Sequence, residues 1–143
     1  MNTEEIKKLY TAVVTTRGGR QGHVLSADGI LNMDLVAPKE MGGSGAQGTN
    51  PEQLFAGAFA GCFESALRLA ASLRKKPLRD ASITAHVTLN AAEKNNFFLS
   101  VELHGKLDGI SKDEALELMR AAHEICPYSK ATRGNVEVKL FAD

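Results

Sequence analysis

The stretch NPEQLFAGAFAGCF, residues 50–63, predicts the start of a long buried helix. Asn50 is a suitable cap for the first turn, Pro51 suits the first helical position, and a glutamine follows three residues after the cap. The helix is predicted to continue to about Lys75, because Pro77 disfavours helical backbone in the residue before it. Apolar side chains fall on nearly every face of this helix, which predicts burial between two sheets or against a partner subunit.

Three short strands are predicted before this helix. Residues 10–16, 23–26 and 31–36 are rich in β-branched and apolar side chains, and glycine-containing turns separate them. Together they predict an antiparallel meander. A loop with four glycines, at residues 38–49, joins the meander to the helix.

After the helix, residues 82–89 and 97–104 predict a hairpin with alternating apolar and polar side chains. A capping box opens a second helix at 112–125, and residues 136–141 predict a last strand. The order of elements predicts an α+β fold with antiparallel groups of strands. A chain of 143 residues is most simply a single domain, here spanning residues 1–143.

The composition excludes several classes of partner. Lys and Arg together number 17, as do Asp and Glu, which argues against nucleic acid or an anionic membrane surface. The first residues lack the apolar segment of a signal peptide, and no uninterrupted apolar stretch reaches about 18 residues. We therefore expect a soluble cytoplasmic protein. The four histidines show no metal-ligand spacing with the cysteines, so no metal site is expected.

The two cysteines of the chain are the candidates for chemistry. Cys62 lies within the apolar helix and Cys126 follows the second helix, so one internal disulfide is possible. Each also has a simpler interpretation, as a buried inert thiol or an idle thiol at a helix end. Because burial raises the pKa of a thiol, a reactive Cys62 needs a nearby cation. Arg20, in a glycine-rich turn, is a candidate, although from composition alone a solvated turn arginine is the better explanation.

Glu52 lies in the first turn of the apolar helix, where an acid also complements the helix dipole. Ten residues of ideal helix separate it from Cys62, which corresponds to about 15 Å of rise and about 80° of rotation. The two side chains of one straight helix therefore cannot share a site. A common site requires either a break in the helix or a contribution from two subunits.

Four motifs resemble those of a known protein family. They are similar, in order and spacing over nearly the whole chain, to the organic hydroperoxide resistance proteins, which share a larger family with osmotically inducible protein C. The motifs are TRGGRQG (16–22), TNPEQLF (49–55), GCF (61–63) and CPYSKATRGN (126–135). Glu64 departs from the expected pattern of a small or apolar residue. It is expected to point away from Cys62, because two helical positions turn a side chain by about 200°.

The resemblance implies a cysteine-based peroxidase that reduces alkyl and fatty-acid hydroperoxides to alcohols in defence against oxidative stress. It implies that Cys62 is the peroxidatic cysteine and Cys126 the resolving one. Arg20 would hold the thiolate and Glu52 would position that arginine. The implied fold is an intertwined homodimer, with two antiparallel sheets around long central helices and active sites at the subunit interface. An external dithiol, a dihydrolipoyl group, would reduce the disulfide, with no metal, flavin or haem.

Three alternatives remain open. A peroxidase of the osmotically inducible type is the nearest, although the early arginine turn and the CPYS motif favour the hydroperoxide resistance type. A non-catalytic protein with two incidental cysteines belongs to a different class, and its thiols would survive treatment with hydroperoxide. Anion binding at the glycine-rich loop and helix start is the third. It is weak, because the Lys-Ser/Thr of a phosphate-binding loop is missing.

Overall fold

The computed structural model describes residues 4–143 and confirms an α+β fold with two three-stranded sheets. The chain divides into two compact units, of which the first ends at Pro51 and the second spans Glu52–Asp143. Whether both behave as one domain over residues 1–143 stays a prediction.

The first unit contains the predicted meander. Strands β1 (Val14–Arg17), β2 (His23–Ser26) and β3 (Asn32–Asp34) pair antiparallel in that order, and two of them are shorter than predicted. The short helix η1 (Gly19–Gln21) connects β1 to β2 and carries Arg20, and η2 (Lys39–Met41) interrupts the later loop.

Glycines shape the turn around η1. Gly18 adopts a left-handed conformation with φ of 80°, which favours glycine. A Cβ on Gly22 would lie against the carbonyl oxygen of Arg17, so the backbone passes too closely for any side chain. The turn that presents Arg20 therefore depends on the absence of side chains at both positions.

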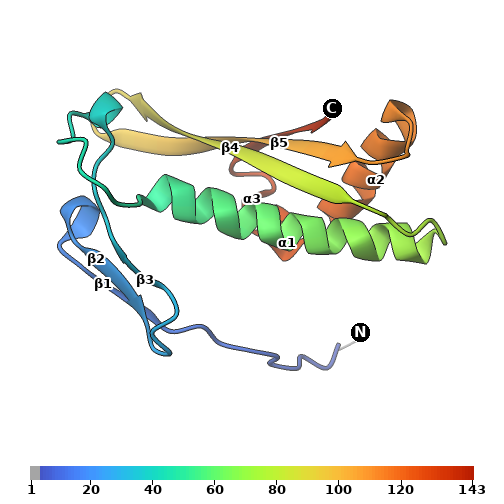
Figure 1. The fold of residues 1–143 in the computed structure, drawn as a ribbon, viewed down its shortest axis with the longest axis horizontal. Coiled ribbons are helices and arrows are strands. Elements are labelled where there is room, and N and C mark those ends of the chain that lie inside the picture. The colour runs from blue at the N-terminus through green and yellow to red at the C-terminus, as the bar shows by residue number, and fades with distance from the viewer. Residues whose placement is uncertain (1–3) are drawn as a thin grey trace. The chain divides into compact units, whose positions relative to one another are not determined.

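Helix α1 (Pro51–Leu73) is continuous, and Figure 1 shows it lying along the hairpin of the second unit. Its buried face includes Phe59, Phe63 and Leu67, each 0% exposed, whereas Leu69 is 49% exposed. Burial on every face is thus not reached within one chain. By length and composition alone α1 could also cross a membrane, with a mean hydropathy of 1.3, but its aromatic face packs in the protein core.

The sheet of the second unit is mixed rather than antiparallel. Strands β4 (Ala81–Ala92) and β5 (Asn96–Leu107) form the predicted hairpin, and β6 (Glu137–Ala142) pairs with β5 in parallel. The parallel pairing corrects the expectation of antiparallel strands throughout. Its cause is the helical crossover between β5 and β6, which returns the chain to the end where β5 began.

Two helices form this crossover. Helix α2 (Lys112–Ile125) has the predicted bounds, and the hydroxyl of its N-cap Ser111 accepts a hydrogen bond from the N–H of Glu114 at 3.3 Å. Helix α3 (Pro127–Thr132) follows after a single residue and was not predicted. The core of the unit joins α1, β5 and α2 through buried side chains such as Phe63, Leu103 and Met119.

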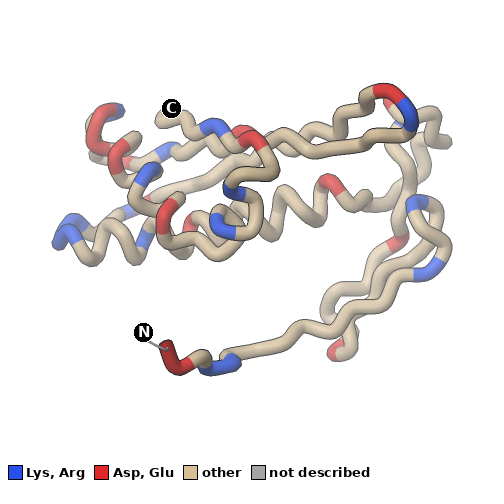
Figure 2. Tube along the Cα trace, turned by 180° about the vertical axis from the view of Figure 1, so that it is seen from behind, with Lys and Arg blue, Asp and Glu red and all other residues tan. Residues whose placement is uncertain are grey.

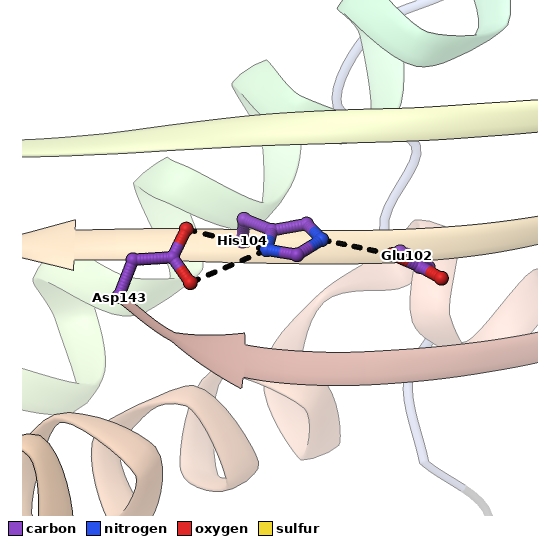
Figure 3. Close-up of polar contacts among 3 residues, drawn as sticks. All are labelled: Glu102, His104 and Asp143. Carbon is purple, nitrogen blue, oxygen red and sulfur yellow. Dashed lines mark hydrogen bonds and ion pairs between the residues drawn. The ribbon is translucent and has the colours of Figure 1, made fainter.

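The opposite face of this sheet is polar. Figure 3 shows the ring of His104 between two carboxylates: Nε2 lies 2.9 Å from Glu102 Oε1, and Nδ1 lies 3.2 Å from Asp143 Oδ2. The same ring stacks on Phe141, with centroids 4.6 Å apart. Both signs of charge are spread along the described chain (Figure 2), as its balanced composition predicts.

Candidate functional site

The two cysteines meet in the second unit. Cys126 is fully buried in the core, and Cys62 is partly buried against the same core. Both are free thiols, and Cys126 lies close enough to Cys62 to raise the pKa of its thiol. The structure therefore brings together the two sulfur atoms that the sequence singles out, which are far apart along the chain.

Local structure explains why each thiol is held there. Cys62 lies in the middle of α1, on the side next to the buried Phe59 and Phe63. Cys126 is the residue between α2 and α3, with extended backbone (φ −62°, ψ 123°). Pro127 occupies the first position of α3, where its fixed φ favours a helix start and its missing N–H costs no hydrogen bond.

The pKa of Cys62 is raised above the ordinary value of a thiol. Burial is the largest cause, followed by the hydrogen bond with Cys126 and by repulsion from that group. A backbone hydrogen bond from Tyr128 acts in the opposite direction and lowers the pKa. Within the second unit alone the neutral thiol is therefore favoured, and a thiolate needs a positive charge nearby, as the sequence argument expected.

The backbone of Tyr128 is a site element that sequence reasoning missed. Its N–H is the second of α3, and the first N–H groups of any helix have no partner within the helix. The signal for it was present in the Cys126-Pro127 pair, which is typical of a helix cap followed by a proline at the first position.

Aromatic rings and one histidine connect α1, which carries Cys62, to the helices on either side of Cys126. The rings of Phe59 and Tyr128 have centroids 5.9 Å apart, and those of Phe63 and His123 are 6.5 Å apart. His123 Nδ1 lies 2.7 Å from the hydroxyl oxygen of Ser129, which is fully buried. The lining of the site is thus largely apolar, with one side-chain hydrogen bond that links α2 to α3.

The remaining predicted site residues are Arg20 and Glu52. Arg20 is half-buried on η1 of the first unit, so its approach to the cysteines stays a prediction. Glu52 lies in the first turn of α1, ten residues before Cys62 on a continuous helix. Since α1 does not break, one of the two routes to a shared site is excluded, and the route through two subunits remains.

Glu64 pairs with Arg68 one turn further along α1. This pairing agrees with the expectation that its carboxylate points away from Cys62, and it compensates the charge locally. Among the residues described, no group of three or more His, Cys, Asp or Glu side chains could hold a metal ion.

Comparison with known proteins identifies close relatives. The family model described as OsmC-like protein matches residues 42–141. The organic hydroperoxide resistance protein OhrB of Bacillus subtilis is 47% identical over 133 residues, which cover 92% of this chain and 96% of that protein. These matches extend over almost the whole length of both sequences.

Solved structures of organic hydroperoxide resistance proteins are also similar to this chain. An organic hydroperoxide resistance protein from Legionella pneumophila, described as a predicted redox protein, has a TM-score of 0.90 and 49% identity, covering 96% of this chain and 99% of that one. A protein from Vibrio cholerae described as a putative organic hydroperoxide resistance protein, with captopril bound in one of its active sites, has a TM-score of 0.89 and 38% identity. The match covers 99% of this chain and 96% of the Vibrio cholerae chain.

Proposed function

Because the chain belongs to the OsmC-like family, and within it to the organic hydroperoxide resistance proteins, we propose that it is a thiol-dependent peroxidase. In this proposal it reduces alkyl and fatty-acid hydroperoxides to alcohols and acts in defence against oxidative stress. The observation that carries the proposal is the proximity of the partly buried Cys62 to the buried Cys126, which raises the pKa of the Cys62 thiol.

The chemistry has three balanced steps. The thiolate of Cys62 attacks the distal oxygen of the hydroperoxide, the O–O bond breaks, and the alkoxide leaves as an alcohol after taking a proton. The resulting sulfenic acid condenses with the thiol of Cys126, which forms the disulfide and releases water. An external dithiol then reduces the disulfide by exchange and leaves as a cyclic disulfide. The net reaction consumes one hydroperoxide and one dithiol.

The buried position of Cys126 favours this cycle over a simple monothiol reaction. A sulfenic acid at Cys62 has its resolving partner already beside it, so condensation competes well with further oxidation to the irreversible sulfinic acid. Bulk solvent does not reach Cys126, which limits its reaction with other oxidants. Cys62, the more exposed of the two thiols, is therefore the one that attacks the hydroperoxide.

The raised pKa of Cys62 makes a cation necessary, and we assign that role to Arg20. A guanidinium stays charged at every physiological pH, and its planar fork can serve a carboxylate on one edge and sulfur or oxygen on the other. Glu52 would position it. This part of the proposal rests on the family motifs around Arg20 and Glu52.

The continuous α1 supports a homodimer with active sites at the interface. Within one chain, its exposed face carries several small or apolar residues, which include Gly57, Gly61, Ser65 and Leu69, together with the charged Arg68. A Cβ built on Gly57 or Gly61 meets none of the described atoms within 4 Å. Small residues at helical spacing permit close approach of another backbone, so a second copy of this chain is the proposed cover.

The reductant is proposed to be a dihydrolipoyl group, free or attached to a protein. A cyclising dithiol suits a disulfide of which one sulfur is buried, because its second thiol completes the exchange without needing further access. No resident cofactor takes part in this scheme, and the protein is proposed to act in the cytoplasm.

Steady-state turnover tests the proposal. Purified protein is assayed with cumene, tert-butyl and fatty-acid hydroperoxides and with hydrogen peroxide, using lipoyl, thioredoxin and glutathione reducing systems in parallel. Cys62→Ser should abolish turnover. Cys126→Ser should reduce one equivalent of hydroperoxide and then stall or become overoxidised, as seen by mass spectrometry.

Two results would contradict this scheme. Thiols that remain titratable after excess hydroperoxide would favour the non-catalytic alternative. Steady-state activity that survives Cys62→Ser would show that the roles of the two cysteines are wrongly assigned.

A further inference from the structure

Cys126 is held in the sharp corner between α2 and α3. Its N–H donates to the carbonyl oxygen of Ala122 at 2.8 Å, and its own carbonyl accepts from the N–H of Lys130 at 3.1 Å. These bonds tie the backbone of Cys126 to each helix separately. The direction of its thiol therefore depends on the angle at which the two helices meet.

One side-chain hydrogen bond closes this corner. His123 and Ser129 lie three residues before and after Cys126, and His123 Nδ1 is 2.7 Å from Ser129 Oγ. The same histidine is tied a second time, because Arg133 Nη2 donates to its carbonyl oxygen at 2.6 Å. Both hydrogen bonds connect a residue before Cys126 to a residue after it.

The closed corner also contacts the helix that carries Cys62. The ring of His123 packs against Phe63, the residue next to Cys62, and Tyr128 packs against Phe59 one turn earlier. Burial, and then the charge of Arg133, lower the pKa of His123, so its ring is neutral at neutral pH. A neutral ring packs against Phe63 without the cost of burying a charge.

We propose that His123 and Ser129 are positioning residues that hold the thiol of Cys126 within reach of Cys62. The inference rests on the proposed function, since it concerns the step in which the disulfide forms. Without the link, the reduced corner samples more angles, and closing the disulfide then costs more conformational entropy. The disulfide should form more slowly and be reduced more easily.

An equilibrium with dithiothreitol measures this effect without any peroxide. Reduced protein is mixed with oxidised dithiothreitol at graded ratios; the two thiols lose two electrons and two protons, and the reagent gains them. Ser129→Ala should lower the equilibrium constant for the protein disulfide about tenfold, or about 30 mV for this two-electron couple. His123→Leu should match it, and His123→Asn, which keeps a polar group near the Nδ1 position, should recover most of the loss.

A double-mutant cycle and a matched control separate positioning from general loosening. The His123→Leu/Ser129→Ala double variant should shift the constant no further than either single variant, because one link is lost in all three. Thr132→Val is the control. It removes a hydroxyl that donates to the carbonyls of Tyr128 and Ser129 at 3.0 and 3.1 Å, within the same short helix, and leaves His123 untouched.

Three results would overturn the inference. The equilibrium constant for the disulfide could be unchanged in a folded Ser129→Ala protein, or the effects of the two substitutions could add in the double variant. Thr132→Val could also lower the constant as much as Ser129→Ala does. Should Ser129→Ala fail to fold, the comparison of His123→Asn with His123→Leu decides in its place. A wild-type protein that forms the disulfide but does not reduce hydroperoxides counts against the proposed function alone. If the wild type reduces hydroperoxides and the variants have the same equilibrium constant for the disulfide as the wild type, only the inference is contradicted.

Discussion

Gly61→Leu tests whether the open face of α1 packs against a second copy of the chain. Within one chain the position is free, because an added Cβ meets none of the described atoms within 4 Å. Leucine is a better helix former than glycine by about 0.8 kcal/mol, so the isolated fold should be unchanged or slightly stabilised. If the chain is a monomer, this small gain is the whole effect.

If the exposed face of α1 is a dimer interface, Gly61→Leu should instead destabilise the protein, by weakening the dimer. Inserting a larger side chain into close packing costs about 1–3 kcal/mol, and a two-fold axis places the change in both copies. Association should then weaken by about 2–6 kcal/mol, which corresponds to about 30-fold to 10⁴-fold in the dissociation constant. The gain in helix propensity belongs to folding and cancels from this difference.

Sedimentation equilibrium of wild type and variant over a wide range of protein concentration measures the association, and denaturant unfolding of the same samples measures the fold. We expect a dimeric wild type and a folded variant that dissociates. A variant that associates as tightly as the wild type, or a wild type that is monomeric throughout, would refute the argument from the open face of α1.

Three further predictions concern the fold and the site. His104 has its pKa raised by the hydrogen bonds to Glu102 and Asp143, so its contribution to stability is complete below the ordinary histidine pKa of about 6.5 and is lost as pH rises through the raised value. Denaturant unfolding between pH 5.5 and 8.5 should show this fall in the wild type, and a His104→Gln variant with the same slope would contradict it. Phe63→Ala should cost about 3–5 kcal/mol of unfolding free energy, because its ring is fully buried; a loss below 1 kcal/mol would show that the site collapses around the cavity. Arg20→Lys should slow peroxide reduction in stopped-flow assays while leaving the thiol count unchanged, because a lysine lacks the planar fork; an unimpaired rate would remove Arg20 from the mechanism.

Much of the local structure could be predicted because its causes are local. Helix α1 begins at Pro51, where proline suits the first helical position, and α2 has the predicted bounds because the Ser111 cap and the Cys126-Pro127 pair mark its two ends. The β4–β5 hairpin follows from alternation alone, although the strands extend beyond the predicted ranges. Each of these features depends on residues that are close together in the chain, so the sequence alone is enough to predict it.

The parallel pairing of β6 depended on how the chain crosses over the sheet. The direction of a strand is decided by the elements between it and its partner, here α2 together with the unexpected α3. A six-residue helix that begins one residue after another helix has no periodicity long enough to detect. Without α3, the corner that holds Cys126 and the role of the Tyr128 backbone could not be seen.

The amino-acid sequence by itself determined the two long helices, the hairpin and the two residues able to do redox chemistry, because side-chain type and short-range spacing control these. Only the tertiary structure decided that the sulfurs of Cys62 and Cys126 are neighbours, that α1 runs unbroken past Glu52, and that His123 reaches Ser129 across the corner. Contacts between segments distant in the chain arise from packing of the whole core, and no local pattern encodes that packing.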